Sequence, residues 1–226
     1  PDTLSGRYGT GNKSCRRSSC QRRKSSIPGP GLRGRALISR IIVNRQILQQ
    51  ACETLEAGGL IAYPTEAVWG LGCDPQSYSS VKRILALKGR SQDKGLILIA
   101  AGVHQLGKLL AGLTAQQLGL IEASWPGPTT WLIPDPANLF PDWIKGKHQS
   151  IAIRVSAHPL VHALCEHFGR PIVSTSANAA GKTAIRSRSE LEAQFGSSID
   201  YVVAGDLGVE ALPSEIRDLL SGSLIR

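Results

Sequence analysis

Two short segments, more than 80 residues apart, carry side chains that can bind a polyphosphate. Lys88-Gly89-Arg90 ends a predicted helix, and Ser174-Thr175-Ser176-Ala177-Asn178 follows a predicted strand. Two cations at a helix end can bind phosphate oxygens, and small hydroxyl and amide side chains add donors in a tight turn. Ser174, Ser176 and Asn178 alternate, so in an extended stretch they face one ligand. Together, and not separately, the two segments predict a phosphate site.

Lys94 adds a third cation close to the first segment. Lys88, Arg90 and Lys94 fall within seven residues that contain a single acid, Asp93. A solvated charged loop is the ordinary interpretation of such a run. This loop, however, leads directly into the apolar run 96–99, and a basic loop next to a buried strand lies at the rim of a sheet. We therefore expect it to face a ligand.

Arg154 lies inside the apolar run Ser150-Ile151-Ala152-Ile153-Arg154-Val155, which has strand character. An arginine in such a position is rarely buried without an anionic partner. The partner could be a structural ion pair or a ligand carboxylate, because a guanidinium matches a carboxylate through two parallel hydrogen bonds. The residues alone leave both interpretations open.

Several other chemistries lack the residues that they require. Gly181-Lys182-Thr183 is not a P-loop, because Ser176 stands where the first glycine belongs. Gly70-Leu71-Gly72 lacks the third glycine of a dinucleotide site, so we interpret it as a turn. The five histidines and five cysteines show no metal-ligand spacing, and no nucleophile elbow indicates Ser-His-Asp catalysis. We interpret Cys52 and Cys165 as core thiols.

The net charge of +9 is concentrated near the N-terminus. Residues 1–40 hold ten Lys and Arg against one acid, whereas residues 41–226 hold 16 basic and 16 acidic side chains. Phosphate affinity of the folded part must therefore be local. No stretch has the ~20 apolar residues of a membrane span, and no secretory signal is present. We expect a cytoplasmic protein with no membrane partner.

The pattern of the chain changes near residue 41. Residues 1–40 are rich in Ser, Gly, Arg and Pro, which predicts a disordered basic tail: a transit segment, an RNA-binding arm or upstream sequence. Residues 41–226 predict a single α/β (α+β) domain with a twisted, largely parallel or mixed sheet flanked by helices. The expected helices span 44–58, 78–88, 103–111, 114–123, 159–168 and 189–195. The expected strands span 60–63, 96–99, 129–133, 150–155, 171–174, 201–203 and 214–218.

The chain resembles the YrdC/Sua5 family in a series of short motifs that occur in the family's order. The motifs are Tyr63-Pro64-Thr65-Glu66-Ala67-Val68-Trp69-Gly70-Leu71-Gly72-Cys73-Asp74-Pro75, Lys88-x-Arg90, Lys94-Gly95-Leu96-Ile97-Leu98-Ile99, Trp125-Pro126-Gly127-Pro128-Thr129, Ala152-Ile153-Arg154-Val155, His158-Pro159-Leu160, Ser174-Thr175-Ser176-Ala177-Asn178 and Pro213-Ser214-Glu215-Ile216-Arg217-Asp218. They cover residues 41–226 and leave residues 1–40 unmatched. The chain looks like the short bacterial form of the family.

The resemblance implies an enzyme that joins L-threonine, bicarbonate and ATP into threonylcarbamoyl-adenylate and releases pyrophosphate. This reaction is the first step toward N6-threonylcarbamoyladenosine in transfer RNA, so the product would pass to the transferase complex that modifies the RNA. Mg²⁺ would arrive with the ATP, and no protein side chain would coordinate the metal.

The resemblance also implies roles for individual residues. The family's signature tetrad at the reaction centre corresponds to Lys88, Arg90, Ser176 and Asn178. The nucleotide would be contacted by Arg90, Lys94, Ser150, Ser176, Asn178 and Arg226. Threonine would be held by Thr65, Arg154, Ser174 and Ser214. These groups would surround a positively charged cleft. Ser91 stands where many members have Pro, and Ile99 or Ala100 stands where they have His.

These residue types suit the implied chemistry. A carbamate must attack the α-phosphorus of ATP, so two anions meet and cations are the main requirement. The labile carbamate must be shielded from water, so we expect a closing loop, with 91–95 and 179–187 as candidates. The alternative is a different class of protein, a structured-RNA-binding or ribosome-maturation module that binds transfer RNA or double-stranded RNA through its basic residues.

Overall fold

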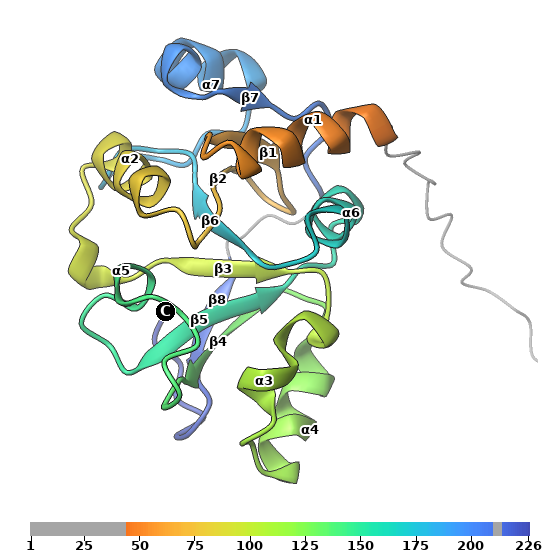
Figure 1. The fold of residues 1–226 in the computed structure, drawn as a ribbon, viewed down its shortest axis with the longest axis vertical. Coiled ribbons are helices and arrows are strands. Elements are labelled where there is room, and N and C mark those ends of the chain that lie inside the picture. The colour runs from red at the N-terminus through yellow and green to blue at the C-terminus, as the bar shows by residue number, and fades with distance from the viewer. Residues whose placement is uncertain (1–43, 210–213) are drawn as a thin grey trace, which may run out of the picture. The chain divides into compact units, whose positions relative to one another are not determined.

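One sheet runs through the domain that the computed structural model describes, residues 44–209 and 214–226. In order across the sheet, its strands are β7 (Tyr201–Val202), β1 (Ile61–Pro64), β2 (Trp69–Gly72), β6 (Ile172–Ser176), β3 (Ile97–Ala100), β5 (Ser150–Val155), β4 (Thr129–Pro134) and β8 (Glu215–Asp218) (Figure 1). Parallel pairs such as β3–β5 stand beside antiparallel pairs such as β3–β6, so the sheet is mixed. The tail expected over 1–40, and Pro213, lie outside the described residues.

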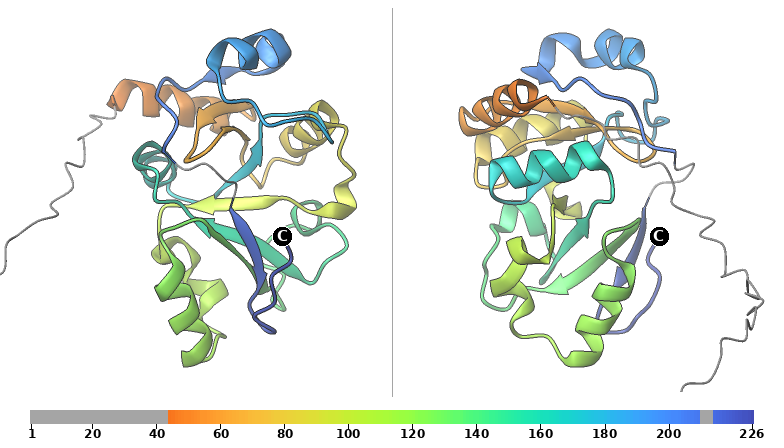
Figure 2. Two further views of the ribbon diagram at one scale, coloured as in Figure 1. Left: turned by 180° about the vertical axis from the view of Figure 1, so that it is seen from behind. Right: turned by 90° about the vertical axis from the view of Figure 1, so that its right-hand side faces the viewer.

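Helices pack around this sheet. They are α1 (Arg45–Glu56), α2 (Tyr78–Lys88), α3 (Gly107–Leu110), α4 (Ala115–Ser124), α5 (Asp142–Lys145), α6 (Pro159–Phe168) and α7 (Arg188–Phe195), with 3-10 turns at Gln92–Lys94, Val103–Leu106 and Gly196–Ser198. α1 and α6 lie side by side, and α3 and α4 lie together away from them (Figures 1 and 2). None of the described helices is long and apolar enough to cross a membrane.

Local sequence signals set several helix ends. Asn44 Oδ1 accepts a hydrogen bond from the Gln46 backbone N–H at 2.9 Å and caps α1. Gly89 and Gly169 adopt left-handed conformations, with φ of 58° and 76°, and end α2 and α6. The predicted bounds of α2 and α6 are confirmed. The helix expected over 103–111 is present in two parts, a 3-10 turn followed by the single turn of α3.

Each face of the sheet packs against an apolar core. On one face, Leu98, Ile153 and Ile133 are fully buried in an apolar core that extends to α2, α4 and α5. On the other face, a second core joins β1, β3 and β6 to α1 and α6, and contains the buried thiols of Cys52 and Cys165. The prediction that these two cysteines are core residues is confirmed.

The turn predicted at Gly70-Leu71-Gly72 is wrong, because these residues belong to β2. A Cβ atom on Gly72 would lie 2.8 Å from Tyr63 Cε1 and 2.8 Å from the Val173 carbonyl oxygen. A Cβ atom on Gly70 would lie 3.3 Å from Tyr63 Cζ. The glycines therefore leave room for an aromatic ring from the neighbouring strand. A contact between strands carries no local sequence signal, which explains the error.

We predict opposite effects for two glycine-to-alanine substitutions. Gly72→Ala should lower the free energy of unfolding by about 1–3 kcal/mol, because the new methyl group has no room between Tyr63 and Val173. Gly119→Ala, inside α4 with nothing within 4 Å of the added methyl group, should raise it by about 0.5–1 kcal/mol. Urea unfolding of both variants measures the difference, and equal destabilisation would contradict this packing argument.

Candidate active site

The register of the strands shows which residues share the face of the sheet that carries the predicted binding residues. Ser174 on β6 lies opposite Ile97 on β3, Ile97 lies opposite Ala152 on β5, and Ala152 lies opposite Leu132 on β4. We call the face that carries these four residues the site face. Although they occupy the middle of a wide sheet, Ile97, Ala152 and Leu132 are partly exposed. The helices therefore leave part of the site face uncovered.

Most of the predicted binding residues on strands share the site face, because alternate residues of a strand point to the same side. The residues on this face are Ser174 and Ser176 on β6, and Ser150 and Arg154 on β5. Ser214 joins them, since its hydroxyl lies 3.1 Å from that of Thr130 on β4. The loop predicted from Ser174 onward is corrected, because β6 continues to Ser176 and ends just before the turn.

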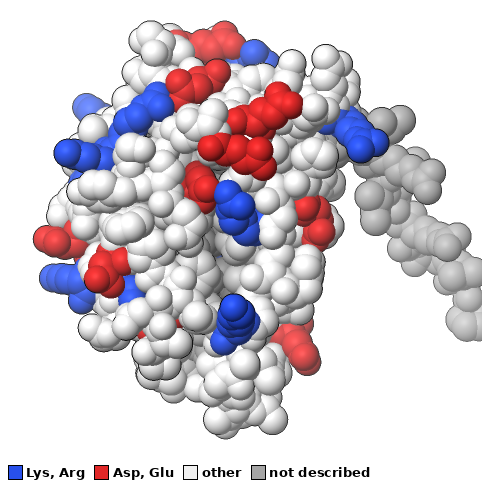
Figure 3. Space-filling view, viewed as in Figure 1, with Lys and Arg blue, Asp and Glu red and all other residues white. Residues whose placement is uncertain are grey.

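The sheet curls toward the site face. β1 and β5 are separated by three strands, so on a flat sheet they would lie ~19 Å apart at ~4.8 Å per strand. Glu66, just after β1, nevertheless forms an ion pair of 2.9 Å with Arg154 on β5. The positive charge of the expected cleft stays a prediction, and Figure 3 shows basic and acidic side chains intermingled on the visible face of the molecule.

Lys88 connects the end of α2 to the turn after β6. Its Nζ donates hydrogen bonds to the Ser176 carbonyl oxygen at 2.5 Å, the Asn178 carbonyl oxygen at 2.8 Å and Asn178 Oδ1 at 3.1 Å. Ser176 Oγ donates to the same Oδ1 at 2.6 Å. Three members of the predicted tetrad therefore form one network. Because an ammonium group has three N–H donors, Lys88 uses all of them to hold this turn.

Burial changes the acidity of Lys88. The residue is only 5% exposed, and loss of water, followed by the charge of nearby Arg90, lowers the pKa of its ammonium to about 8. The three oxygen acceptors around Nζ favour the charged form. Lys88 is thus protonated at neutral pH and supplies positive charge from beneath the Ser176–Asn178 turn.

Arg90, the fourth member of the tetrad, does not bond to the other three. Its Nη2 donates to the carbonyl oxygens of Gly95 at 2.9 Å and Lys94 at 3.3 Å, so it folds back over its own loop. Burial, and then the charge of Arg226, lower the pKa of Arg90. Arg226 Nη2 also reaches the Ser214 carbonyl oxygen at 3.4 Å. Arg226 therefore lies near Arg90 and Ser214, and its contact with a nucleotide stays a prediction.

The two predicted closing loops differ in how they are anchored. The loop 91–95 is tied to α5 and the residues after it, since the Leu96 N–H donates to the Ile144 carbonyl oxygen and the Lys147 N–H donates to that of Asp93. In the loop 179–187, residues 180–183 are exposed. Loop closure stays a prediction, and the exposed tip of 179–187 is the better candidate.

The Glu66 ion pair answers the question left open for Arg154. Both side chains are buried, with residue exposures of 8% for Arg154 and 7% for Glu66, so the structural ion pair is confirmed. The guanidinium has five N–H donors, so binding of a ligand carboxylate stays a prediction beside the ion pair. Thr65 lies next to Glu66, and its hydroxyl donates to the Val68 carbonyl oxygen at 2.7 Å.

Sequence reasoning did not single out three polar residues near Arg154. Glu66 Oε1 accepts a hydrogen bond from Ser156 Oγ at 2.6 Å, and the backbone N–H of His158 donates to the same hydroxyl at 3.1 Å. Their only sequence signal is position, since Glu66 and His158 lie within quoted motifs and Ser156 directly follows another. The structure places all three near Arg154 and Thr65, two residues that are predicted to bind the threonine substrate.

Comparisons with known proteins agree with this arrangement. The model of the Sua5_yciO_yrdC family, described as telomere recombination, matches residues 53–226. Two relatives named threonylcarbamoyl-AMP synthase, from Pseudomonas fluorescens and Stutzerimonas stutzeri, are 49% and 52% identical over 179 residues. Each alignment covers 79% of this chain and 96% of the relative.

Two solved structures resemble the fold. P. abyssi Sua5 complexed with L-threonine is 32% identical, with a TM-score of 0.73 over 79% of this chain and 53% of that protein. This chain therefore spans about half the length of that Sua5. E. coli YciO is 23% identical, with a TM-score of 0.68 over 77% of this chain and 84% of that protein, and it bears on the fold alone.

We predict that burial of Lys88 makes stability depend on pH in a defined direction. The folded pKa, about 8, lies below the unfolded value near 10.5, so the unfolded state binds more protons between these pH values. The free energy of unfolding of the wild type should therefore rise through this window relative to Lys88→Met, by up to about 3 kcal/mol.

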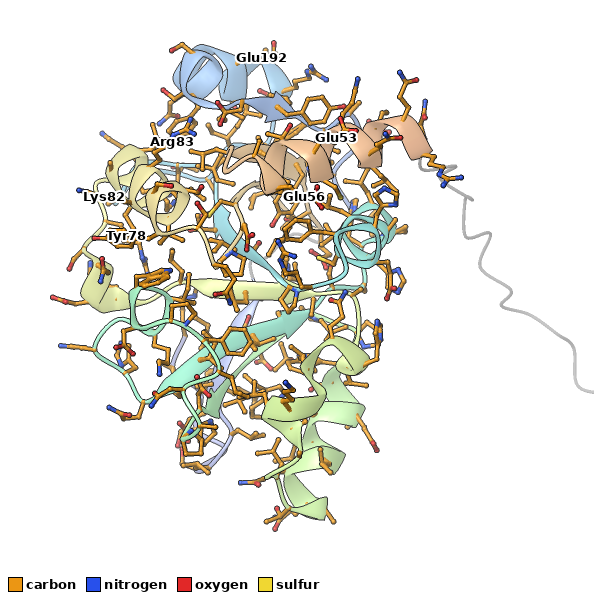
Figure 4. The ribbon with its side chains drawn as sticks, viewed as in Figure 1. Glu53, Glu56, Tyr78, Lys82, Arg83 and Glu192 are labelled. Atoms are coloured by element: carbon orange, nitrogen blue, oxygen red, sulfur yellow. The ribbon has the colours of Figure 1, made fainter. Side chains whose placement is uncertain are left out.

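Urea unfolding of both proteins from pH 7 to pH 10.5 tests this sign. Lys82→Met is the matched control, because Lys82 lies on the exposed side of the same helix (Figure 4). It should keep the pH profile of the wild type. A wild type that loses stability relative to Lys88→Met over this range would contradict the assignment.

Proposed function

Because the chain belongs to the Sua5/YciO/YrdC family, we propose that it is a threonylcarbamoyl-AMP synthase. It would join L-threonine, bicarbonate and ATP into threonylcarbamoyl-adenylate and release pyrophosphate. The observation that carries the proposal is the network in which Lys88 holds Ser176 and Asn178 at the edge of the uncovered site face. That network joins, from distant segments, three of the four tetrad residues by which the chain resembles the family.

The nucleotide would lie along the part of the site face that helices leave uncovered. Ser150 and Ser176 border this part and offer hydroxyl groups, while Arg90, Lys94 and Arg226 provide charge for the triphosphate and the departing pyrophosphate. Charge stabilisation and positioning do most of the work in transfers at phosphorus, so a side-chain nucleophile is not needed.

Magnesium would enter with ATP. Among residues 44–209 and 214–226, no group of three or more His, Cys, Asp or Glu side chains is arranged to hold a metal ion. We propose that the metal would be coordinated mainly by substrate phosphates. When bound, Mg²⁺ would neutralise part of the phosphate charge, and the protein residues would position the nucleotide.

Threonine would bind where Arg154 and Ser174 lie on the site face, next to Thr65 and Ser214. Arg154 suits the carboxylate, because its buried guanidinium offers donors beyond the one used by Glu66. The threonine amine would trap carbon dioxide as a carbamate, whose oxygen then attacks the α-phosphorus of ATP. With threonine held at one part of the face and ATP at another, the carbamate oxygen would lie next to the α-phosphorus.

The product would serve transfer RNA modification. Threonylcarbamoyl-adenylate is a reactive mixed anhydride, so it must pass quickly to a transferase that acts on the RNA, and we place the enzyme in the cytoplasm with that acceptor. The alternative, an RNA-binding module, finds little support in the balanced charge of residues 41–226. Direct RNA affinity would be strongly salt-dependent, which separates it from synthase activity.

We predict that pyrophosphate release from ATP requires both threonine and bicarbonate. Arg90→Ala should reduce this activity by about 10²-fold or more, because it removes a cation that would bind the phosphates. Arg188→Ala is the matched control, since Arg188 is an exposed arginine on α7 that pairs with Glu192 at 2.7 Å, away from the site. It should retain wild-type activity. A coupled pyrophosphate assay measures all three proteins.

Two results would overturn the proposal. Pyrophosphate release that does not depend on threonine would indicate another adenylation reaction or simple hydrolysis. A wild type without release, but with salt-sensitive RNA affinity, would favour the binding module. Full activity of Arg90→Ala would leave the reaction in place and refute the assignment of that residue.

A further inference from the structure

A buried lysine outside the candidate active site holds the short helix α5. Lys145, the last residue of α5, is 3% exposed. Its Nζ donates a hydrogen bond to Asn138 Oδ1 at 2.6 Å, and lies 3.4 Å from Asp142 Oδ1 and 3.7 Å from Asp135 Oδ2. A buried ammonium group is costly unless oxygen atoms surround it in this way. Lys145 therefore joins α5 to the loop that follows β4.

Asp135 ties the same loop from its other end. This residue is 1% exposed, and its carboxylate accepts hydrogen bonds from the backbone N–H groups of Leu139 at 2.8 Å and Phe140 at 3.0 Å. Buried charge clusters add little net stability, but they fix the positions of the groups that they join. We call Asp135, Asn138 and Lys145 the Lys145 cluster. It sets the conformation of the chain from the end of β4 to the end of α5.

α5 packs directly against the loop that carries predicted nucleotide residues. It lies beside the 3-10 turn Gln92–Lys94 (Figure 1), and the Leu96 N–H donates to the Ile144 carbonyl oxygen at 2.9 Å. A Cβ atom on Gly95 would lie 2.8 Å from the Lys145 carbonyl oxygen. The φ of Gly95 is also 61°, so both the close approach and the backbone conformation require glycine here.

The neighbouring contact is equally close. Gly146, directly after α5, has a φ of 65°, and a Cβ atom on it would lie 2.5 Å from the Asp93 carbonyl oxygen. The Lys147 N–H donates to the same oxygen at 3.2 Å. Because the two backbones touch without side chains between them, one has little room to shift against the other. The position of α5 therefore sets the position of the loop 92–96.

Arg90 depends on this loop in turn. Its Nη2 donates to the Gly95 carbonyl oxygen at 2.9 Å, and its Nε donates to the same oxygen at 3.3 Å. Gly95 is thus contacted by α5 and by the Arg90 guanidinium. The route from Lys145 to Arg90 runs through the backbone of Gly95, so Lys145 can influence Arg90 without a contact to a substrate.

We propose that Lys145 is a positioning residue for ATP, because it holds α5 against Gly95 and thereby fixes the guanidinium of Arg90. This inference rests on the proposed function and deepens it, since Arg90 is among the residues proposed to bind the triphosphate. Arg154 and Ser174, proposed to bind threonine, lie on β5 and β6 and are not part of this route. Affinity for the nucleotide should therefore depend on Lys145, and affinity for the amino acid should not.

We predict a selective loss of nucleotide affinity in Lys145→Met. This variant should bind ATP with Mg²⁺ about tenfold more weakly and should keep its affinity for L-threonine within about twofold. Lys108→Met is the matched control, because Lys108 is an exposed lysine on α3, and it should bind both ligands as the wild type does. Isothermal titration calorimetry of the full chain with one ligand at a time measures these affinities without turnover.

A double-mutant cycle tests whether Lys145 acts through Arg90. In an Arg90→Ala background, Lys145→Met should weaken ATP by less than about twofold more, because the side chain that Lys145 positions is absent. Lys145→Arg should recover most of the ATP affinity, since a guanidinium keeps the charge and the donors. A loss in the Arg90→Ala background as large as in the wild type would contradict the route through Gly95.

A milder variant keeps the test valid if Lys145→Met does not fold. Asn138 is exposed and has a φ of 50°, which glycine adopts readily, so Asn138→Gly removes the acceptor of the 2.6 Å hydrogen bond and leaves the core intact. It should weaken ATP by about threefold and leave L-threonine unchanged.

The outcomes distinguish this inference from the function on which it rests. Unchanged ATP affinity in Lys145→Met and Asn138→Gly, or an equal loss for ATP and L-threonine, refutes the positioning role while the synthase assignment stands. A wild type that neither binds ATP nor releases pyrophosphate with threonine and bicarbonate overturns the proposed function, and this inference with it. A selective loss for ATP that disappears in the Arg90→Ala background supports the inference.

Discussion

A buried ammonium group is the constraint on which the candidate active site depends. Lys88 Nζ has lost its contact with water, so its charge is tolerated only because three oxygen atoms of Ser176 and Asn178 surround it. Two of these oxygens are backbone carbonyls, so satisfying the lysine fixes the conformation of the turn itself. The Ala180 N–H adds a second link by donating to the Lys88 carbonyl oxygen at 2.7 Å. The end of α2 and the turn after β6 therefore behave as one unit.

This constraint explains how the sequence could predict part of the site and not the rest. Helix ends follow from neighbouring residues, so the bounds of α2 and the cap at Gly89 were predictable. The grouping of Lys88 with Ser176 and Asn178 was predicted from their residue types, and the resemblance added their roles, but no local signal indicated the hydrogen bonds by which Lys88 holds the turn. β2 was missed, and Glu66 was not identified as the partner of Arg154, because a ring packed on glycines and a carboxylate that reaches across a curled sheet are contacts between distant segments.

The site face separates two electrostatic environments. Near the tetrad, Arg90 and Arg226 lie close enough that the charge of one lowers the pKa of the other, and among the described residues neither has an acidic partner. Around Arg154, the positive charge is balanced by Glu66. An excess of positive charge suits a polyphosphate, whereas a guanidinium held in place by a carboxylate suits the carboxylate of an amino acid. The arrangement therefore matches a nucleotide and an amino acid that must react with each other.

The cost of the buried Arg154 to Glu66 pair gives this separation its physical meaning. Removing two charges from water costs about as much as their attraction returns, so a pair of apolar side chains would stabilise the fold at least as well. Stability therefore does not account for the pair. A ligand carboxylate bound by Arg154 would account for it, because Glu66 then holds the guanidinium in position. The energetically unfavourable part of the site face is thus the part where recognition of the small substrate is expected.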